Sequence, residues 1–443
     1  MTTHTDLPGT TRSSELFERA QRVLPGGVSR NTVLRSPHPA YADRGVGCRV
    51  FDLEGNEFID FSNNMCSLIH GHAPPEVTRA VGEQLGRGTA FMMATETEVL
   101  YAEHLCSRCP AFEKLRFVNS GTEALMVALK AARAFTGRPK VAKIEGAYHG
   151  GYDYAEISQA PVPETWGDAS RPRSVPLVHG TPRSALDDVV IIPFNDAERA
   201  VAILEEHADD LACVLIDLMP HRVGLTPASP EFVHALRDWA TRNGALLVLD
   251  EVITFRSAFG GLQTHAGVSP DLTALGKMIG GGFPVGAVAG RAEVMDVMNP
   301  RGDHYLFPHS GTFSANPMST TAGLAAMRLF DEHAVARLNA LAVRAMHGIN
   351  EAITSTGARA CVTGGGSMFR VHMKPEPPRN FREAYATEAE NRRLKVLLDH
   401  LFDAGFIMIN TCTAALSTPM TEVEIDALVG AMKTGLAKTA SMD

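Results

Sequence analysis

The 443-residue chain lacks the features of a secreted or membrane-bound protein. Its N-terminus has no basic start followed by an apolar stretch, so we expect no signal peptide. No apolar run approaches the roughly 20 residues that a membrane-spanning helix needs. The seven cysteines are scattered and odd in number, which indicates a reducing compartment rather than a disulfide framework. These absences predict a soluble protein of the cytoplasm.

Positive charge is also scarce, because 41 Lys and Arg residues face 50 Asp and Glu residues, for a formal charge of −9. Such a chain has no bulk electrostatic attraction for nucleic acid or for an anionic membrane, so we expect neither as a partner. Any anion must instead be bound locally. There is no fixed-period repeat and no low-complexity tract, and a hydrophobic content of 45% is typical of a globular protein.

The order of apolar runs predicts an α/β fold. Residues 48–61 form two such runs around a Glu-Gly-Asn turn, which indicates a hairpin. From about Pro75 to about Ser319, helical stretches alternate with short strands, and this alternation predicts a mostly parallel sheet covered on both faces. The strands are expected at residues 115–118, 141–144, 212–216, 245–249 and 285–289. The chain then becomes helical and ends in a helix near residues 422–436.

One segment, residues 159–187, is rich in proline and glycine and has no predicted structure of its own. A long loop of this kind within a compact domain is often functional. It is either a lid near a site or a plain surface excursion.

Residues 115–135 predict a strand, a tight turn and a helix. The turn contains Ser120 and Gly121, and Thr122 is placed to cap the helix. Free backbone N–H groups and the helix dipole make such a turn an anion site. An ordinary strand–helix turn has the same pattern, and the segment matches neither a Walker loop nor a dinucleotide-binding fingerprint.

Two acids and a lysine follow apolar runs. Asp250 ends the run 245–249, and Asp217 follows another strand. Ligands of open α/β sheets bind at the carboxyl ends of strands, although an acid there is more commonly just solvated. Lys277 lies among small and apolar residues (275–282), where desolvation favours a neutral, nucleophilic amine. The alternative is a surface lysine before a glycine-rich loop.

Three smaller signals complete the set. Tyr148 and His149 follow the strand expected at 141–144, so the tyrosine ring could stack on a flat ligand. The turn at residues 309–312 has two hydroxyls suited to phosphate oxygens. A CxxC pair at residues 106–109 has no second pair, so we expect no metal site.

Taken together, these segments place an anion cradle, a carboxylate, an aromatic ring and a nucleophilic lysine at strand ends. Pyridoxal 5′-phosphate (PLP) needs these four parts: the cradle for its phosphate, the carboxylate to keep its ring nitrogen protonated, the aromatic cover, and the lysine for the Schiff base and proton transfer. We therefore expect PLP as cofactor.

Over residues 15–436 the chain resembles the class III aminotransferases of PLP fold type I. The matching motifs are NSGTEA (119–124), YHG (148–150), DEV (250–252), LGK with its glycines (275–282) and GTFSANP (311–317). The resemblance implies a seven-stranded, mostly parallel sheet in a large PLP-binding domain, residues 76–320. It also implies a smaller α+β domain built from both chain ends, residues 1–75 and 321–443.

The resemblance also implies roles for single residues. Lys277 is the Schiff-base lysine, and Asp250 is the partner of the pyridine nitrogen. The other implied cofactor contacts are Ser120, Gly121 and Thr122 on the phosphate, Tyr148 with His149 at the ring, and Val252 behind it. Thr312 would reach the phosphate of a neighbouring subunit, which implies a homodimer with shared active sites.

Within the family, the motifs PGGVSR (25–30) and GHAPP (71–75) are most similar to the branch of glutamate-1-semialdehyde aminomutase and the β-amino-acid transaminases. In that branch an arginine at the position of Arg30 binds the substrate carboxylate, a task that suits a bidentate guanidinium. The alternative is a surface arginine.

The chain departs from this branch in three places. Asp217-Leu218 replaces a glutamate-proline pair, and a glycine is missing between Thr254 and Phe255, although Arg256 remains. Residues 410–419 carry neither the arginine that some relatives use for the acceptor carboxylate nor the acidic residue of the aminomutase.

These features predict a ping-pong aminotransferase. Its donor would be a carboxylate-bearing amine, such as a β- or ω-amino acid, and its acceptor a 2-oxo acid. One alternative is an intramolecular aminomutase, which needs no external acceptor. The composition of residues 410–419 weakens this alternative more than it weakens the transaminase prediction. The other is a PLP-binding scaffold without turnover.

Overall fold

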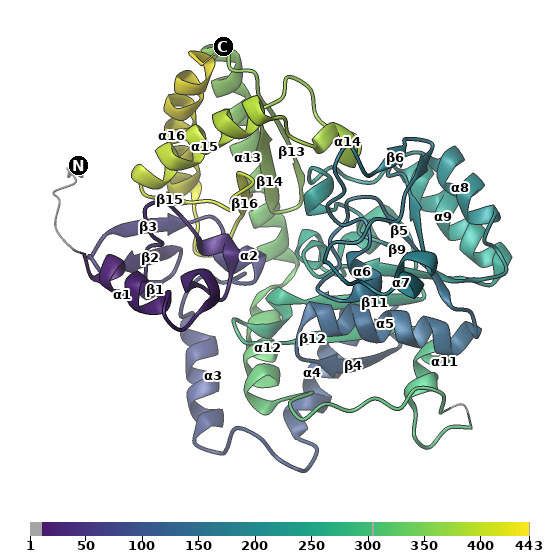
Figure 1. The fold of residues 1–443 in the computed structure, drawn as a ribbon. Helices are drawn as coiled ribbons and strands as arrows, with labels where there is room; N and C mark the ends of the chain where they lie inside the picture. The colour runs from purple at the N-terminus through teal and green to yellow at the C-terminus, as the bar shows by residue number, and fades with distance from the viewer. Residues whose placement is uncertain (1–10, 304, 443) are drawn as a thin grey trace.

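The structure is a computed structural model that describes residues 11–303 and 305–442. A large sheet with helices on both faces occupies one side of the molecule, and the two chain ends meet beside it (Figure 1). Within these residues no helix is long and apolar enough to cross a membrane.

The large sheet has seven strands in the order β4-β12-β11-β10-β9-β5-β8. All run parallel except β12, which pairs antiparallel with both of its neighbours. The strands are β4 (Lys114–Val118), β5 (Lys140–Ile144), β8 (Val189–Ile192), β9 (Leu211–Ile216), β10 (Leu246–Asp250), β11 (Leu272–Gly276) and β12 (Gly286–Gly290). The predicted fold class is confirmed, as are the five predicted strands; the apolar pattern missed β8 and β11.

The central strands are buried because their two faces pack against different helices. Leu247 and Leu249 of β10 pack on one face with Trp239 of α9 (Pro230–Asn243). Leu246 and Val248 face the other way, into a cluster with α5 (Gly121–Thr136). Alternate side chains therefore enter two separate cores, which is why these strands are apolar throughout.

The chain ends form a smaller α+β unit. The predicted hairpin is present as β2 (Arg49–Asp52) and β3 (Glu57–Asp60). A strand from the other end, β15 (Phe406–Ile407), pairs parallel with β3. A further sheet joins β13 (Cys361–Gly365), β14 (Met368–His372) and β16 (Thr413–Ala415). This unit from both ends agrees with the expected fold; its boundaries at residues 75 and 320 stay a prediction.

The main helices outside the large sheet connect these units. They are α1 (Arg12–Ala20), α3 (Pro75–Leu85), α4 (Glu96–Arg108), α8 (Ala197–Glu205), α12 (Pro317–Leu329), α13 (Glu332–Thr356), α15 (Glu388–Asp403) and α16 (Glu422–Ala440). Shorter elements are β1 (Ala42–Val46), α2 (Asn63–Cys66), α6 (Asp153–Glu156), α10 (Leu262–Ala266), α11 (Ala292–Met295), α14 (Phe381–Ala384) and the 3₁₀ turns η1 (Pro25–Gly27), η2 (Asn31–Val33), η3 (His221–Val223), η4 (Thr254–Ser257), η5 (Lys277–Gly280) and η6 (Asp296–Met298).

The segment 159–187 has structure of its own, contrary to the prediction. It contains a small ribbon, β6 (Gly167–Asp168) with β7 (Arg171–Pro172), and the helix α7 (Arg183–Asp187). Arg382 of α14 donates to the carbonyl oxygens of Trp166, Gly167 and Asp168. Trp166 also packs edge-on against Phe381. These contacts tie the segment to α14 along the side of the sheet.

Candidate active site

Three predicted side chains lie at the carboxyl edge of the large sheet. Asp217 follows β9, Asp250 ends β10 and Lys277 follows β11, and these three strands are adjacent. Parallel pairing of β10 with β11 sets Asp250 opposite Ala274, three residues before Lys277. The sheet therefore gathers at one edge residues that are up to 60 positions apart in the sequence.

Asp250 is buried and its two oxygens have different partners. Oδ2 lies 2.8 Å from Nδ1 of His149, and Oδ1 accepts the backbone N–H of Val252 at 2.9 Å. His149 is fully buried, and its Nε2 has no partner within the described part of the chain. Burial lowers the pKa of His149, so the ring is neutral with its proton on Nδ1, facing the carboxylate. A carboxylate held in this way keeps lone pairs free for a ligand.

The neighbouring acids Asp217 and Glu251 are buried, so the alternative of simply solvated acids at these strand ends does not apply. Burial and the nearby Asp250 raise the pKa of Asp217 well above its usual value, which favours its neutral form. Burial raises the pKa of Glu251 to about 7. Its oxygens accept the N–H groups of Leu262 and Gln263 at the start of α10. Glu251 therefore positions a helix, and Asp250 is the acid left facing the site.

Lys277 adopts φ = 49°, in the left-handed region that side chains other than glycine rarely occupy. Strain of this kind costs about 1–3 kcal/mol and persists where the surrounding fold holds it. The side chain is part-buried, and among the described residues its amine has neither a hydrogen bond nor an ion pair. Its Nζ is thus held at the sheet edge with no competing partner.

The predicted anion cradle lies at the start of α5. Ser120, and not Thr122 as expected, caps the helix: its Oγ accepts the N–H of Glu123 at 3.1 Å. The helix accordingly begins at Gly121. The Thr122 hydroxyl instead accepts the N–H of Gly151 at 3.3 Å, so it joins the helix to the loop that carries Tyr148.

Glycines let the backbone segments of this cradle approach one another. A Cβ added to Gly121 would lie 2.9 Å from Cγ1 of Val252, and one added to Gly150 would lie 2.5 Å from the Thr122 hydroxyl. A Cβ added to Gly276 would lie 3.2 Å from Cα of Gly121. Side chains at these positions would crowd the neighbouring segments, so the glycines let the backbone close around the helix N-terminus. The cradle thus fits a phosphate group.

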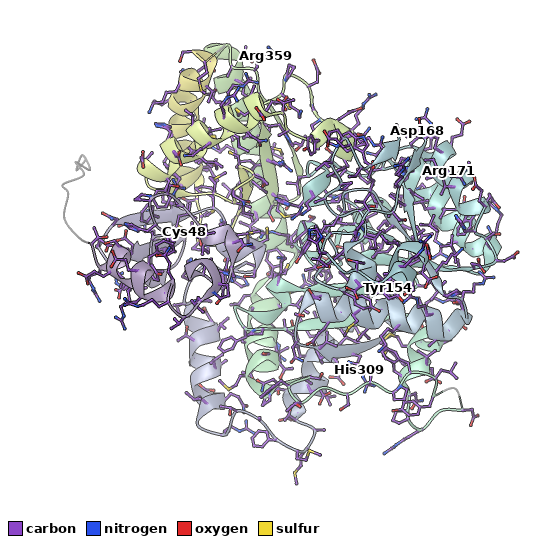
Figure 2. The ribbon with its side chains drawn as sticks, in the orientation of Figure 1. Cys48, Tyr154, Asp168, Arg171, His309 and Arg359 are labelled. Carbon is purple, nitrogen blue, oxygen red and sulfur yellow. The ribbon has the colours of Figure 1, made fainter. Side chains whose placement is uncertain are left out.

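The remaining predicted residues lie around this edge. Tyr148 is half exposed. Thr312 is exposed, and no hydrogen bond of its side chain occurs within the described residues. The turn before Thr312 lies beside β4, because Arg116 donates to the carbonyl oxygen of His309 at 2.8 Å (Figure 2).

Arg30 reaches the short helix α2, where its Nη1 donates to Oδ1 of Asn64 at 2.6 Å. Cys66 ends the same helix. Burial raises the pKa of its thiol, while the positive charges of Arg256 and Lys277 oppose this rise. The helix that holds Arg30 thus ends within range of the Lys277 charge, and Arg30 itself is exposed.

The sequence analysis missed His221 and assigned no role to Arg256. Burial and nearby positive charges lower the pKa of His221 to about 3, and its Nε2 lies 2.9 Å from the Thr411 hydroxyl. Arg256 is fully buried and donates to Ser367 and to the carbonyl oxygen of Leu416. Both link the large sheet to residues 411–417. The sequence held only one signal for them, the arginine retained in the motif after Asp250.

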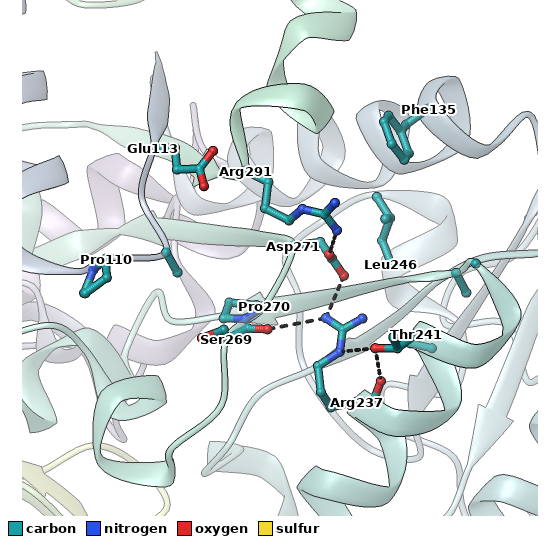
Figure 3. A pocket seen from close by; sticks show the side chains of 14 residues that line it. Pro110, Glu113, Phe135, Arg237, Thr241, Leu246, Ser269, Pro270, Asp271 and Arg291 are labelled. Atoms are coloured by element: carbon teal, nitrogen blue, oxygen red, sulfur yellow. Dashed lines mark hydrogen bonds and ion pairs between the residues drawn. The ribbon is translucent and has the colours of Figure 1, made fainter.

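A hollow of about 610 Å³ lies at the opposite edge of the sheet (Figure 3). There Asp271 pairs with Arg237 and Arg291 and accepts the N–H of Leu247. Because Asp271 is already paired with two arginines, it has no charge left for a ligand, unlike Asp250 at the carboxyl edge. Within residues 11–303 and 305–442 no cluster of three metal-ligating side chains occurs.

Comparison with known proteins identifies the family of this chain. The family model for class III aminotransferases matches residues 32–427. Glutamate-1-semialdehyde 2,1-aminomutase of Methanothermobacter thermautotrophicus is 40% identical over 374 residues, which are 84% of this chain and 86% of that protein.

Two solved structures are similar over nearly the whole chain. An omega-transaminase from Sphaerobacter thermophilus is 45% identical with a TM-score of 0.95, and 98% of each chain is covered. A beta-phenylalanine aminotransferase from Variovorax paradoxus is 34% identical with a TM-score of 0.87, covering 97% of this chain and 94% of that one. The chain therefore belongs to the class III aminotransferases, and it is a PLP-dependent aminotransferase.

Proposed function

We propose that this enzyme moves an amino group from a carboxylate-bearing amine, a β- or ω-amino acid, to a 2-oxo acid by a ping-pong mechanism. The observation that carries the proposal is the unpartnered amine of Lys277 at the same sheet edge as the Asp250–His149 pair, with Arg30 at the rim. The similarity to an omega-transaminase and to a beta-phenylalanine aminotransferase supports this donor class.

Each residue of the site has a separate role, which depends on its position. Bound PLP supplies a ring that withdraws electrons from the substrate carbon bearing the amine. The Lys277 amine takes the proton from that carbon as general base and returns a proton as general acid. The buried Asp250 carboxylate, oriented by His149 and by the Val252 N–H, would hold the ring nitrogen of the bound cofactor in its protonated form.

The phosphate is held by the cradle at the start of α5. The N–H groups of Gly121 and Thr122 begin the helix, and the Ser120 hydroxyl can donate because its oxygen already accepts the Glu123 N–H. Val252, packed against Gly121, would support the ring from behind, and Tyr148 would cover it. The resemblance to the family supports these proposed roles.

We propose a homodimer in which Thr312 of each subunit reaches the phosphate site of the other. Two segments near this turn expose large apolar side chains, among them Met92, Met93 and Phe313. Asn316 donates to the carbonyl oxygen of Thr89 at 2.8 Å, which joins these segments into one surface. Burial of that surface against a second copy would explain its composition. Sedimentation of the holoenzyme tests this proposal, and a monomer that binds PLP normally would contradict it.

Two further proposals concern the whole chain. We take residues 76–320 as the PLP-binding domain, with residues 1–75 and 321–443 forming the smaller one. We also propose a cytoplasmic location, because all seven cysteines are free thiols, a state that a reducing compartment maintains.

The second candidate is a 2,1-aminomutase, which the name of the Methanothermobacter relative favours. An aminomutase needs no acceptor, whereas a transaminase stops after one turnover without one. The absence of an acidic residue in 410–419 favours the transaminase.

A panel of amine donors tests the function directly. The holoenzyme is mixed with each donor, and loss of visible absorption is followed with and without pyruvate or 2-oxoglutarate. We expect β- or ω-amino acids to consume the absorption and turnover to require the oxo acid. Full turnover of an amino-aldehyde acid without an acceptor would favour the aminomutase instead.

The Arg30 assignment has its own test. We expect Arg30→Gln to raise KM for a β-amino acid about tenfold, the loss of one charge-assisted contact, and to leave KM for an amine without a carboxylate unchanged. Equal effects on both amines would assign Arg30 to the fold.

A further inference from the structure

The turn after β9 brings an arginine to the site that no assigned role uses. The 3₁₀ turn η3 begins five residues after the end of β9, and Arg222 lies at its centre. The guanidinium carbon of Arg222 is 5.8 Å from the centre of the Tyr148 ring. Tyr148 is the side chain expected to cover the cofactor ring, so Arg222 lies within reach of the same space.

The backbone of η3 is fixed from several sides. Nε2 of His221 lies 2.9 Å from the Thr411 hydroxyl and 3.2 Å from that of Thr413. The carbonyl oxygen of His221 accepts Nη1 of Arg370 at 2.9 Å, and Val223 is fully buried. The Arg222 side chain is therefore an exposed group on a rigid base, which is how a binding residue is pre-organised.

Arg222 has no protein partner for its charge. Within residues 11–303 and 305–442 it makes no hydrogen bond and no ion pair, and its ring contact with Tyr148 is uncharged. The acids nearest along the sheet edge are engaged elsewhere, since Asp217 accepts the Met219 N–H and Asp250 faces His149. Lys277 and Arg370 add further positive charge around His221. The wall formed by η3 is thus cationic and lacks an anion.

We propose that Arg222 binds the carboxylate of the 2-oxo acid acceptor. The inference rests on the proposed transaminase function and adds the group that selects its second substrate. Arg30 lies on α2 and Arg222 on η3, so the two guanidiniums approach the site from different elements. Residues 410–419 contain no arginine, and in the structure they meet this turn through Thr411. The cation for the acceptor therefore comes from η3.

The test compares a charged acceptor with its neutral ester. Enzyme loaded with pyridoxamine 5′-phosphate is mixed with pyruvate or with methyl pyruvate, and the return of visible absorption is followed. We expect Arg222→Gln to lower kcat/KM for pyruvate about 10- to 100-fold and to change that for methyl pyruvate less than about threefold. Arg222→Lys should fall between, because it keeps the charge but loses the bidentate geometry.

A matched control and a second readout complete the design. Arg359 is also exposed and free of hydrogen bonds and ion pairs among the described residues, and it lies at the far end of the smaller unit (Figure 2). Arg359→Gln should therefore leave kcat/KM unchanged for both acceptors. Calorimetry with propanoate, an unreactive carboxylate, gives the second readout. Its Kd should rise by a similar factor for Arg222→Gln and stay unchanged for Arg359→Gln.

The outcomes separate this inference from the proposed function. If no donor consumes the visible absorption of the unmodified enzyme, the transaminase proposal fails, while the propanoate measurement still tests Arg222. If donors react normally and Arg222→Gln affects pyruvate and methyl pyruvate equally, or slows only the donor half-reaction, the assignment of Arg222 is wrong.

Discussion

The two edges of the large sheet each carry a buried aspartate, but the two carboxylates have different partners. At the amino edge, Asp271 is neutralised by Arg237 and Arg291 and accepts one backbone N–H (Figure 3). At the carboxyl edge, Asp250 has a neutral histidine and one backbone N–H, and the nearby cations Lys277 and Arg222 form no ion pair with it. The difference shows how one scaffold holds both a structural and a functional acid.

The physical reason lies in what each arrangement leaves available. A buried ion pair with all its hydrogen bonds made has nothing to offer a ligand, and removing one partner is costly to the fold. A buried carboxylate held by neutral groups keeps its charge for whatever binds next. The carboxyl edge also holds a lysine in left-handed geometry and a buried lysine, Lys143, whose amine donates to the carbonyl oxygens of Ala147 and Ile157.

The largest effect is expected for Lys277→Ala. Without its amine, the step that moves a proton at the substrate carbon has no base, so amino transfer should fall at least about 1000-fold. Initial rates with donor and acceptor measure this loss. The free energy of unfolding should stay nearly unchanged, because alanine has the same backbone strain at this position. Turnover at the unmodified rate would sink the mechanism.

Asp250→Asn should lower kcat about 100- to 1000-fold. The amide can still accept the Val252 N–H, but it no longer places a negative charge at the ring nitrogen. Asp217→Asn is the matched control, because burial and the nearby Asp250 raise the pKa of that neighbouring acid and favour its neutral form; its kcat should change less than about threefold. Equal losses in the two variants would show that the edge needs both acids for shape alone.

Asp271→Asn tests the opposite edge. The change removes the anion that Arg237 and Arg291 share, and Arg291 keeps only its ion pair with Glu293. The free energy of unfolding should therefore fall by roughly 2–3 kcal/mol. Since Asp271 lies away from the site, kcat of the folded enzyme should stay unchanged. Denaturant titration together with initial rates measures both quantities, and a loss of kcat at constant stability would break the contrast between the edges.

The last prediction concerns the pH dependence of stability. Burial lowers the pKa of Lys143 to about 7, while the unfolded chain keeps the ordinary value of 10.5. Between these values the unfolded state binds more protons, so raising the pH favours the folded state. Relative to Lys143→Met, the unmodified enzyme should gain up to about 1.4 kcal/mol per pH unit from about pH 7 upwards. Parallel stability profiles from pH 7 to 9.5 would contradict the shift.

Much of this site could be predicted because PLP chemistry requires particular residues after particular strands. The Asp250 and Lys277 motifs each follow an apolar run, and parallel pairing brings such positions to one edge. Ser120 and Gly121 were found from the strand–turn–helix pattern, although the choice between Ser120 and Thr122 as cap depended on where the helix begins. Strands β8 and β11 were missed although turn residues flank both of them, Asp188 and Pro193 at β8 and Pro270 before β11.

Local pattern thus determined the α/β alternation, the hairpin at the start and the residue types of the cofactor site, since each depends on neighbours within a few positions. Only the tertiary structure decided which acid keeps its charge, because that depends on burial and on His149, about 100 residues away. It also decided that Arg222 faces Tyr148 while Arg237 forms an ion pair with Asp271. A guanidinium has the same chemistry at both places, and the fold decides whether a carboxylate of the protein lies close enough to pair with it.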